Sequence, residues 1–548
     1  MIYDCLIVGA GWAGLQACKF AKEKGLSALV LEAREDLGGI WNYSSDPDTI
    51  TVMKSTVMSS SCTVTESSDF YMKSEYGKFL RHDEALEYLQ DYVKYFGLTD
   101  HLLFNSRVLR AYKADGLWRV ETQDSTYQSR NLVVCSGLHQ LERNDIDVFN
   151  DYEGQIIHSG HIKHVASDSY SETDSILVYG GGETASDIVE LLVETRAEIV
   201  WACPGGQHFF RKSRKYRDTP VGYFRKDAPR ALDEGSAPLV QMLSSPDDGK
   251  PGYAWICRRS STGSPTDYLG HGIPEWHNDI PFLRAFANKN GHVVDFVRNG
   301  RVIPKRDVKS AFNSGVVFDD GEKREFSHVI LCTGYTADFS FLPELFRQRP
   351  LSKLFKLIFD TGDTSLLYIG FARPTISSIP LMTEFQCRYA FDVLAGELHL
   401  PDEKSMAAIA HRDALERDRF FNFRRRPPTL VSPFIYSRDL GRLTGIKPKY
   451  FRLFTKSPTS AIKAFLSPSG APQMLLNDDD QRDAAVSRLW SRNDYQMTFL
   501  LPLVIFLSRA SLYGRLIDWL TERRFRQDEL KLQRFANSEP AQLAIRSQ

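Results

Sequence analysis

Cysteine is scarce in this chain, and the few cysteines present do not form a motif. Among 548 residues there are eight, with no CxxC pair and no spacing typical of a zinc site. The sequence therefore predicts neither a dithiol redox centre nor a structural zinc, and a reduced intracellular protein is the simplest interpretation. The positions are Cys5, Cys18, Cys62, Cys135, Cys203, Cys257, Cys332 and Cys387.

An excess of charge and a long apolar run are also lacking. The 68 basic and 69 acidic residues nearly cancel, so no general field draws the chain to nucleic acid. The most apolar window, 497–507, is interrupted by Pro502 and is shorter than the roughly 20 apolar residues that cross a bilayer. The first strand-like run starts close to Met1, which leaves no room for a signal peptide. We therefore expect a cytoplasmic protein.

Familiar catalytic constellations are missing as well. The sequence has no GxSxG elbow, no metal-binding triad and no carboxylate pair that spacing alone would place in one site. His82 and His158 are the tempting general bases, but we interpret both as residues that hold turns or satisfy backbone groups. No catalytic side chain and no metal ligand is predicted, and the reactive chemistry is expected to belong to a cofactor.

What the chain does contain is a strand, a glycine turn, a helix, a second strand and an acid, all within residues 2–41. In such a unit the first glycine permits the tight turn, and the second lets a pyrophosphate approach the backbone. The third glycine allows close helix packing, and the acid accepts hydrogen bonds from a ribose. The composition, 42% hydrophobic and 25% charged, is that of a globular protein rather than a disordered one. We predict an ADP-containing dinucleotide, bound by Gly9, Ala10, Gly11, Trp12, Ala13, Gly14 and Glu32.

The same unit recurs in residues 176–203, with one informative difference. The second strand of this repeat ends in Trp201-Ala202-Cys203 and carries no carboxylate. A 2'-phosphate would be repelled by a carboxylate and needs a cation, so NADPH is preferred to NADH. Basic residues at 211–215 are candidate partners, although such a cluster is also typical of a solvated face. The predicted binding residues are Gly180, Gly182, Thr184, Ala185, Ser186, Asp187, Arg214 and Lys215.

Two further stretches have less specific patterns. The glycines of 37–41 would let the chain pass close to a cofactor, and Trp41 either covers a flat ring or caps the core. Residues 51–70 are rich in Ser and Thr, which favours a surface loop. Residues 81–96 have apolar positions at helical spacing and predict a helix that faces the core. Residues 107–135 alternate in the manner of a small antiparallel sheet.

The two glycine units end alike, which indicates that one domain is inserted in the other. A strand leads into Cys135-Ser136-Gly137 in the first half and into Cys332-Thr333-Gly334 in the second. The length suggests roughly two to four domains. We predict two nested Rossmann-like domains and a mainly helical C-terminal extension. The predicted divisions are 1–168, 169–325 with a variable insertion near 205–290, 326–400 and 401–548.

Taken together, these residues resemble the flavin-containing monooxygenases, the class B flavoprotein group that also includes the Baeyer-Villiger monooxygenases. The matches run in order from about residue 1 to 400 and include both glycine motifs, 38–41, 68–70 and 384–388. The resemblance implies FAD in the first domain and NADPH in the second. It also adds Ile40, Trp41, Ser59 and Ser60 to the predicted cofactor-binding residues.

The chain departs from the family pattern at two positions. The identifying motif is present as Tyr152, Gly154 and His158, but its final aromatic position holds Ile162. Where the family usually has an Asn near the flavin ring, an ungapped count from 68–70 gives Ser59. A hydroxyl can donate one hydrogen bond there but lacks the second group of an amide.

The resemblance implies a mechanism in which NADPH reduces FAD, dioxygen adds to give a C4a-hydroperoxyflavin, and one oxygen atom passes to a small organic substrate. Nitrogen, sulfur and carbonyl oxygenation all stay open. Two alternatives also stay open: a flavoprotein reductase that passes electrons to an acceptor without oxygen insertion, and a nucleotide-binding protein without turnover. The substrate itself is not predicted.

The end of the chain allows two interpretations. Residues 497–526 combine an apolar stretch with Arg515, Arg523 and Arg524, a pattern that suits a helix lying on an anionic membrane surface. The alternative, which we favour, is a helix packed on the first domain.

Overall fold

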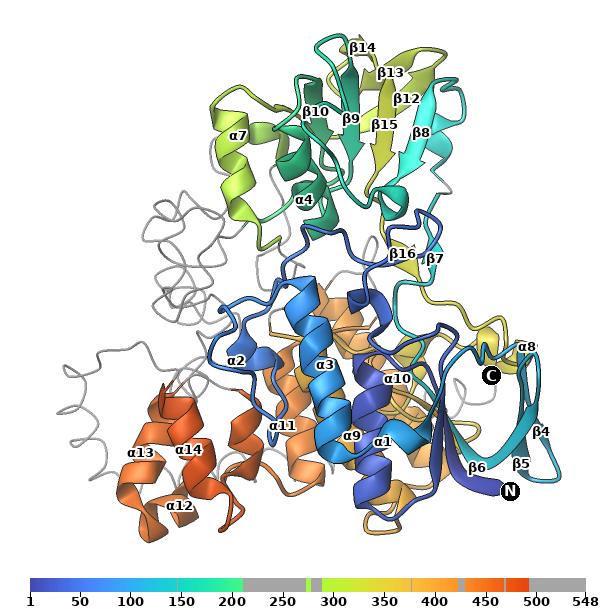
Figure 1. Ribbon diagram of the computed structural model, residues 1–548, viewed down its shortest axis with the longest axis vertical. Coiled ribbons are helices and arrows are strands. Elements are labelled where there is room, and N and C mark those ends of the chain that lie inside the picture. The colour runs from blue at the N-terminus through green and yellow to red at the C-terminus, as the bar shows by residue number, and fades with distance from the viewer. Residues whose placement is uncertain are drawn as a thin grey trace.

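Each glycine motif follows the central parallel strand of its own sheet, and the two sheets lie in separate units (Figure 1). The computed structural model describes residues 1–144, 146–209, 273–276, 288–375, 377–421, 429–467 and 470–491. In Figure 1 the sheet of the first motif lies in the lower unit, and the sheet of the second motif lies in the upper unit.

The first sheet has seven strands and is built around β1 (Ile2–Val8). It follows the order β3-β2-β1-β6-β5-β4, with β17 also paired to β6. β1 is parallel to β2 and β6, whereas β4, β5 and β6 form the antiparallel meander that the sequence predicted. The other strands are β2 (Ala28–Leu31), β3 (Leu102–Leu103), β4 (Arg110–Ala114), β5 (Leu117–Glu121), β6 (Thr126–Val134) and β17 (Leu366–Tyr368).

Three helices share one core with this sheet: α1 (Trp12–Glu23), α3 (His82–Phe96) and α9 (Ile379–Leu394). The prediction for residues 81–96 is confirmed, because α3 buries Leu89, Tyr92 and Val93 in that core. α3 begins with Glu84 bonded back to the Arg81 backbone and ends at a glycine in the left-handed region.

The second sheet has the order β11-β10-β9-β15-β8, and all its pairings are parallel. One face packs on α4 (Glu183–Leu192) and α7 (Val294–Arg298), and the other face packs on the small sheet β12-β13-β14 (Figure 1). The strands are β8 (Gln155–His158), β9 (Ser175–Tyr179), β10 (Glu198–Ala202), β11 (Ile303–Lys305), β12 (Val308–Phe312), β13 (Gly315–Phe318), β14 (Lys323–Glu325) and β15 (His328–Leu331).

The chain leaves the first sheet after β6, builds the second sheet, and returns as β17 beside β6, so the predicted nested arrangement is confirmed. The strands β7 (Leu141–Glu142) and β16 (Tyr335–Thr336) pair antiparallel where the chain passes between the units (Figure 1). The divisions at 168 and 325 stay predictions. Strand pairing, however, places β8, which precedes 168, and β15, which follows 325, in the second sheet.

One local prediction is wrong. The serine- and threonine-rich stretch 51–70 is not a surface loop, because residues 61–68 are all buried and include the short helix α2 (Cys62–Thr65). Small hydroxyl side chains can be buried when their hydrogen bonds are satisfied. Ser67 and Ser68, for example, bond to side chains of α1 and α9.

The described part of the C-terminal extension is mainly helical, as predicted. Among the described residues, no helix combines the length and apolar character needed to span a bilayer. The segment 497–526, for which the sequence left two interpretations, lies outside the described residues. The late elements are α8 (Glu344–Arg347), β18 (Arg373–Pro374), α10 (Glu403–Phe421), β19 (Leu430–Val431), α11 (Pro433–Leu443), α12 (Tyr450–Lys456), α13 (Pro458–Leu466) and α14 (Arg482–Ser491).

Candidate functional site

The first glycine turn has the geometry that its three glycines predict. Gly9 has φ +102°, and a Cβ there would lie 2.9 Å from the Cys135 carbonyl oxygen. A Cβ on Gly14 would lie 1.8 Å from the Gly9 carbonyl oxygen, so this position must be glycine for α1 to pack on the turn. A Cβ on Gly11 would instead meet nothing nearer than Gly39 Cα at 3.6 Å. The space in front of Gly11 suits a phosphate at the helix N-terminus.

Glu32 lies where the sequence places it, at the end of β2 and beside the first turn. Its carboxylate accepts hydrogen bonds from the backbone N–H groups of Ala10 at 2.7 Å and Arg34 at 2.9 Å. Each carboxylate oxygen can accept more than one bond, so a ribose hydroxyl can still bind there. Trp12 acts differently: its ring stacks on Tyr88, with centroids 5.3 Å apart. A cofactor contact at Trp12 would therefore be made by its backbone.

The second turn repeats the first closely. Gly180 has φ +133°, and a Cβ there would lie 2.3 Å from the Cys332 carbonyl oxygen. Gly182 begins α4 with φ −77° and ψ 176°, and Gly11 begins α1 with φ −76° and ψ −174°. A Cβ on Gly182 would meet no atom within 4 Å. The two turns thus have the same geometry. In each, the first glycine packs on a cysteine carbonyl, and the glycine at the helix N-cap faces open space.

Three side chains of the second motif are placed by burial or by a hydrogen bond. Ala185 and Ser186 are buried, and Asp187 accepts a hydrogen bond from Asn290. Trp201 is the penultimate residue of β10, which ends at Ala202, and its indole N–H donates to the Gly180 carbonyl at 2.7 Å. Arg214 and Lys215, the candidate partners of a 2'-phosphate, lie outside the described residues and stay predictions, as does Thr184 as a binding residue.

Asn288 supports the second turn and was missed by the sequence reasoning. Its side-chain amide donates to the Gly182 carbonyl at 2.9 Å and to the Ser186 hydroxyl at 2.5 Å, and the residue is fully buried. Asn288 follows the irregular stretch 220–280, where no periodicity marks it. Only the return of the chain to the second turn brings it there.

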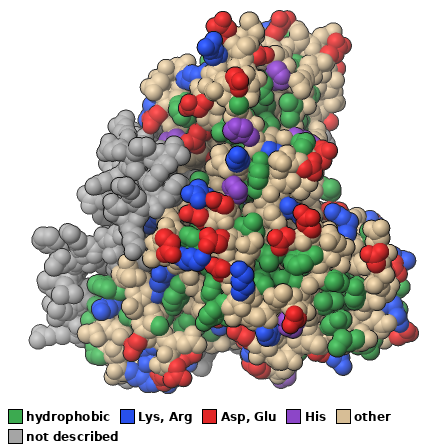
Figure 2. Space-filling view, in the orientation of Figure 1, with side chains coloured by type: hydrophobic (Ala, Val, Ile, Leu, Met, Phe, Trp, Pro, Cys, Tyr) green, Lys and Arg blue, Asp and Glu red, His purple; other side chains and the backbone are tan. Residues whose placement is uncertain are grey.

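The second turn lies at a junction between the two units. Ser59, from the first unit, bonds through its hydroxyl to the carboxylate of Glu183, which directly follows Gly182. Glu183 also accepts from the backbone N–H of Lys289 at 3.3 Å. Burial lowers the pKa of nearby Arg373, and the Glu183 carboxylate opposes that effect. Figure 2 shows histidine and charged side chains at the level where the two units meet.

The remaining predicted flavin-side residues lie in the first unit. Ile40 and Trp41 belong to a turn of 3-10 helix, η1 (Gly39–Trp41), and Trp41 packs partly buried against the first core. The Ser60 hydroxyl lies 2.9 Å from that of Thr65 at the end of α2. Their roles in cofactor binding stay predictions.

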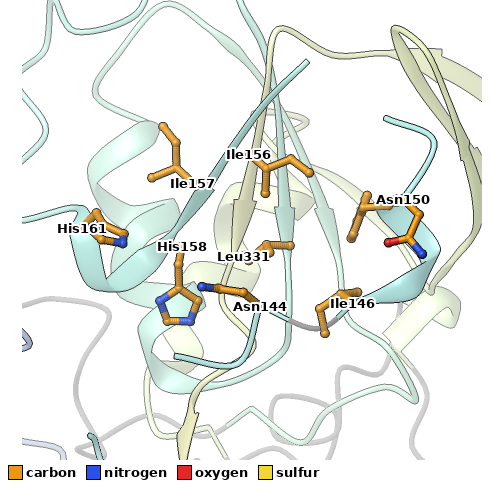
Figure 3. A pocket seen from close by; sticks show the side chains of 9 residues that line it. Asn144, Ile146, Asn150, Ile156, Ile157, His158, His161 and Leu331 are labelled. Carbon is orange, nitrogen blue, oxygen red and sulfur yellow. The ribbon is translucent and has the colours of Figure 1, made fainter. Parts of the chain in front are cut away.

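A separate cavity of about 510 Å³ lies along the edge strand β8 and includes none of the predicted cofactor residues. Figure 3 shows His158 and Asn144 at one end of it and Ile146 and Asn150 at the other. His158 Nδ1 accepts from the Gly160 N–H at 3.1 Å, and Nε2 lies 3.2 Å from the Gly334 carbonyl. Its ring therefore satisfies backbone groups of the connecting segments, as the sequence interpretation expected.

The family described as flavin-binding monooxygenase-like matches residues 4–218 and 287–502. The chain is 26% identical to human flavin-containing monooxygenase 2, over 94% of this chain and 99% of that protein. It is 25% identical to 4-hydroxybenzoate brominase (decarboxylating) of Marinomonas mediterranea, over 86% of this chain and 89% of that protein.

The S-allyl-L-cysteine S-oxygenase of Allium sativum has a similar structure, with a TM-score of 0.58 and 19% identity. The likeness covers 90% of this chain and 99% of that one, and it supports the two-domain fold.

The family match covers well over half of the chain and includes both glycine turns and the segment that joins them. It confirms the predicted resemblance, and with it the cofactors FAD and NADP. The chain belongs to the flavin-binding monooxygenase-like family and is a flavin-dependent monooxygenase.

Proposed function

We propose that this protein uses NADPH and dioxygen to insert one oxygen atom into a small organic substrate, at nitrogen, sulfur or a carbonyl carbon. The observation that carries the proposal is the contact between Ser59 and Glu183, which joins the flavin-side segment to the first residue after the second glycine turn. A reductant bound at one turn and a flavin bound at the other would then share one junction.

The residues of this chain supply binding, orientation and exclusion of water. Open backbone at Gly11 and Gly182 suits two pyrophosphates, and Glu32 suits the ribose of the first nucleotide. The flavin, when bound, accepts hydride and activates dioxygen. The buried segment 61–68 follows Ser59 and Ser60 along the chain, and dry surroundings favour transfer of oxygen over its loss as peroxide.

NADPH is proposed over NADH on the basis of the second unit. β10 ends at Ala202 and is followed by the buried Cys203, so no acid takes the position that Glu32 holds after β2 in the first unit. A 2'-phosphate would therefore meet no carboxylate at that strand end. Replacing Arg214 and Lys215 by Ala should weaken NADPH binding far more than NADH binding. Equal losses would remove these two residues from the phosphate site.

The departure at Ile162 does not restrict the substrate class. Ile162 is buried with Val165 and Ile176 in the core of the second unit. The aliphatic side chain of Ile162 contributes to core packing. The proposal therefore keeps nitrogen, sulfur and carbonyl oxygenation as possible reactions.

The test is to supply NADPH and isotopically labelled dioxygen to the flavin-loaded protein, with amine, thioether and ketone substrates in parallel. Label in a product together with NADPH oxidation supports the proposal. Fast NADPH oxidation without label in any product, combined with rapid reduction of an added electron acceptor, would assign the chain to the reductases instead. A protein that binds both nucleotides and oxidises no NADPH would contradict both functions.

A further inference from the structure

The loop 66–72, in which residues 66–68 and Met72 are buried, brings together charged and polar groups from distant parts of the chain. Asp69 pairs with Lys19 of α1 at 2.6 Å, and the Ser68 N–H donates to Glu384 of α9 at 3.0 Å. The Ser67 N–H donates to the hydroxyl of Tyr88 in α3 at 2.9 Å. The polar residues of the loop are therefore held by three helices of the first unit, α1, α3 and α9.

The first residue of this loop, Glu66, is held by the C-terminal helix α14. The Arg488 guanidinium donates to both Glu66 carboxylate oxygens, at 3.0 and 2.5 Å, and to the Met72 carbonyl at 2.9 Å. The Met72 N–H donates to Glu66 at 3.1 Å, and the guanidinium lies 4.9 Å from the centre of the Tyr71 ring. Glu66 is 1% exposed, so this bidentate pair is shielded from water and salt.

Glu66 is also the C-cap residue that directly follows α2, and the other end of α2 leads to the flavin-side serines. Ser60 and Thr65 lie 2.9 Å apart through their hydroxyls, across the helix from one end to the other. A second C-terminal residue backs the same helix, because a Cβ on Gly470 would lie 2.5 Å from the Thr63 carbonyl oxygen. Two separate residues of the C-terminal extension, Arg488 and Gly470, therefore pack against α2 or the residue that follows it.

We propose that Arg488 is a positioning residue for the flavin site, and that through Glu66 it holds α2 and Ser60 in place. The C-terminal extension is then part of the support of the flavin pocket. The contacts alone show which elements pack against α2. The role of Ser60 at the flavin site rests on the proposed function. Because loss of Arg488 removes both hydrogen bonds of the buried bidentate pair and the bond to the Met72 carbonyl, it should loosen α2 locally.

Cys62 reports on α2 directly. Its side chain is 1% exposed, and its thiol donates to the Gly77 carbonyl at 2.9 Å. Cys5 and Cys203 are buried in the first and second cores and serve as internal controls. The rate at which each thiol is alkylated in the native full-length protein, read by mass spectrometry, measures local opening at each site.

The variants are Arg488→Met, Arg488→Lys and the control Arg482→Met. Arg482 lies on the same helix, and its guanidinium bonds to the Leu476 carbonyl and to Asp479 within the C-terminal extension. In Arg488→Met we expect alkylation of Cys62 to accelerate at least about tenfold over the control, with Cys5 and Cys203 unchanged. Arg488→Lys should lie between, because an ammonium cannot make the bidentate pair.

The flavin-side role is read from the rate of FAD release on dilution, followed by flavin fluorescence. This rate should rise in Arg488→Met and not in Arg482→Met, and it does not require oxygen transfer to occur. Equal Cys62 reactivity in the two variants, a parallel rise at all three cysteines, or unchanged FAD release would overturn the proposal. A chain that inserts no oxygen would contradict the proposed function and leave these readouts intact.

Discussion

The second glycine turn offers a sharp test, because two of its glycines are required for different physical reasons. Gly180 has φ +133°, and a Cβ there would meet the Cys332 carbonyl oxygen at 2.3 Å. Gly182 has φ −77°, and a Cβ there would meet nothing within 4 Å. Gly180→Ala should therefore damage the fold of the second unit, whereas Gly182→Ala should leave the fold intact and obstruct the ligand.

The expected magnitudes differ accordingly. Backbone strain together with movement of the Cys332 carbonyl should make Gly180→Ala cost roughly 3 kcal/mol of unfolding free energy. Gly182→Ala is compatible with its backbone conformation and should be neutral or stabilising by up to about 1 kcal/mol. Its added methyl enters the space expected for the pyrophosphate, so NADP⁺ affinity should fall at least about tenfold, or 1.4 kcal/mol.

The assay pairs thermal unfolding with NADP⁺ titration of the flavin-loaded protein. FAD content should stay at the wild-type level in both variants, since the first turn is untouched. Wild-type NADP⁺ affinity in Gly182→Ala would refute the assignment of that space to the pyrophosphate. Wild-type stability in Gly180→Ala would refute the steric argument for the turn.

Three further changes test other parts of the structure. Gly14→Ala should prevent α1 from packing on the Gly9 carbonyl and yield little flavin-loaded protein. Gly11→Ala should fold normally and bind FAD more weakly. Thermal unfolding and the flavin content of the purified protein measure both effects. Asn288→Ala removes buried hydrogen bonds from the second turn and should cost about 2 kcal/mol and weaken NADP⁺ binding, while FAD affinity holds. Burial lowers the pKa of His139 to about 4, so its neutral form favours the folded state. The contribution of His139 to the free energy of unfolding should be fully present above about pH 6.5 and should fall by at most about 3 kcal/mol toward pH 4. Urea titrations at several pH values should show a flatter pH dependence in His139→Gln.

The local sequence was sufficient to predict the two nucleotide-binding turns. The conformation of their glycines is a local property of the backbone, and the strand and helix that flank them have clear periodicities. The matching ends at Cys135 and Cys332 were also visible in the sequence, and their carbonyls pack against Gly9 and Gly180. The nested order followed from that repetition.

Long-range packing decided what the sequence did not predict. β8 and β15 are paired in the second sheet although nothing in their composition distinguishes them from strands of the first. The stretch 61–68 looked like a surface loop because its residues are small and polar, and it is buried only because partners such as Glu384 and Arg488 arrive from more than three hundred residues away. Asn288 reaches the second turn in the same way. Local conformational preferences can be read along the chain, whereas the satisfaction of buried polar groups depends on where distant segments meet, and only the tertiary structure contains that information.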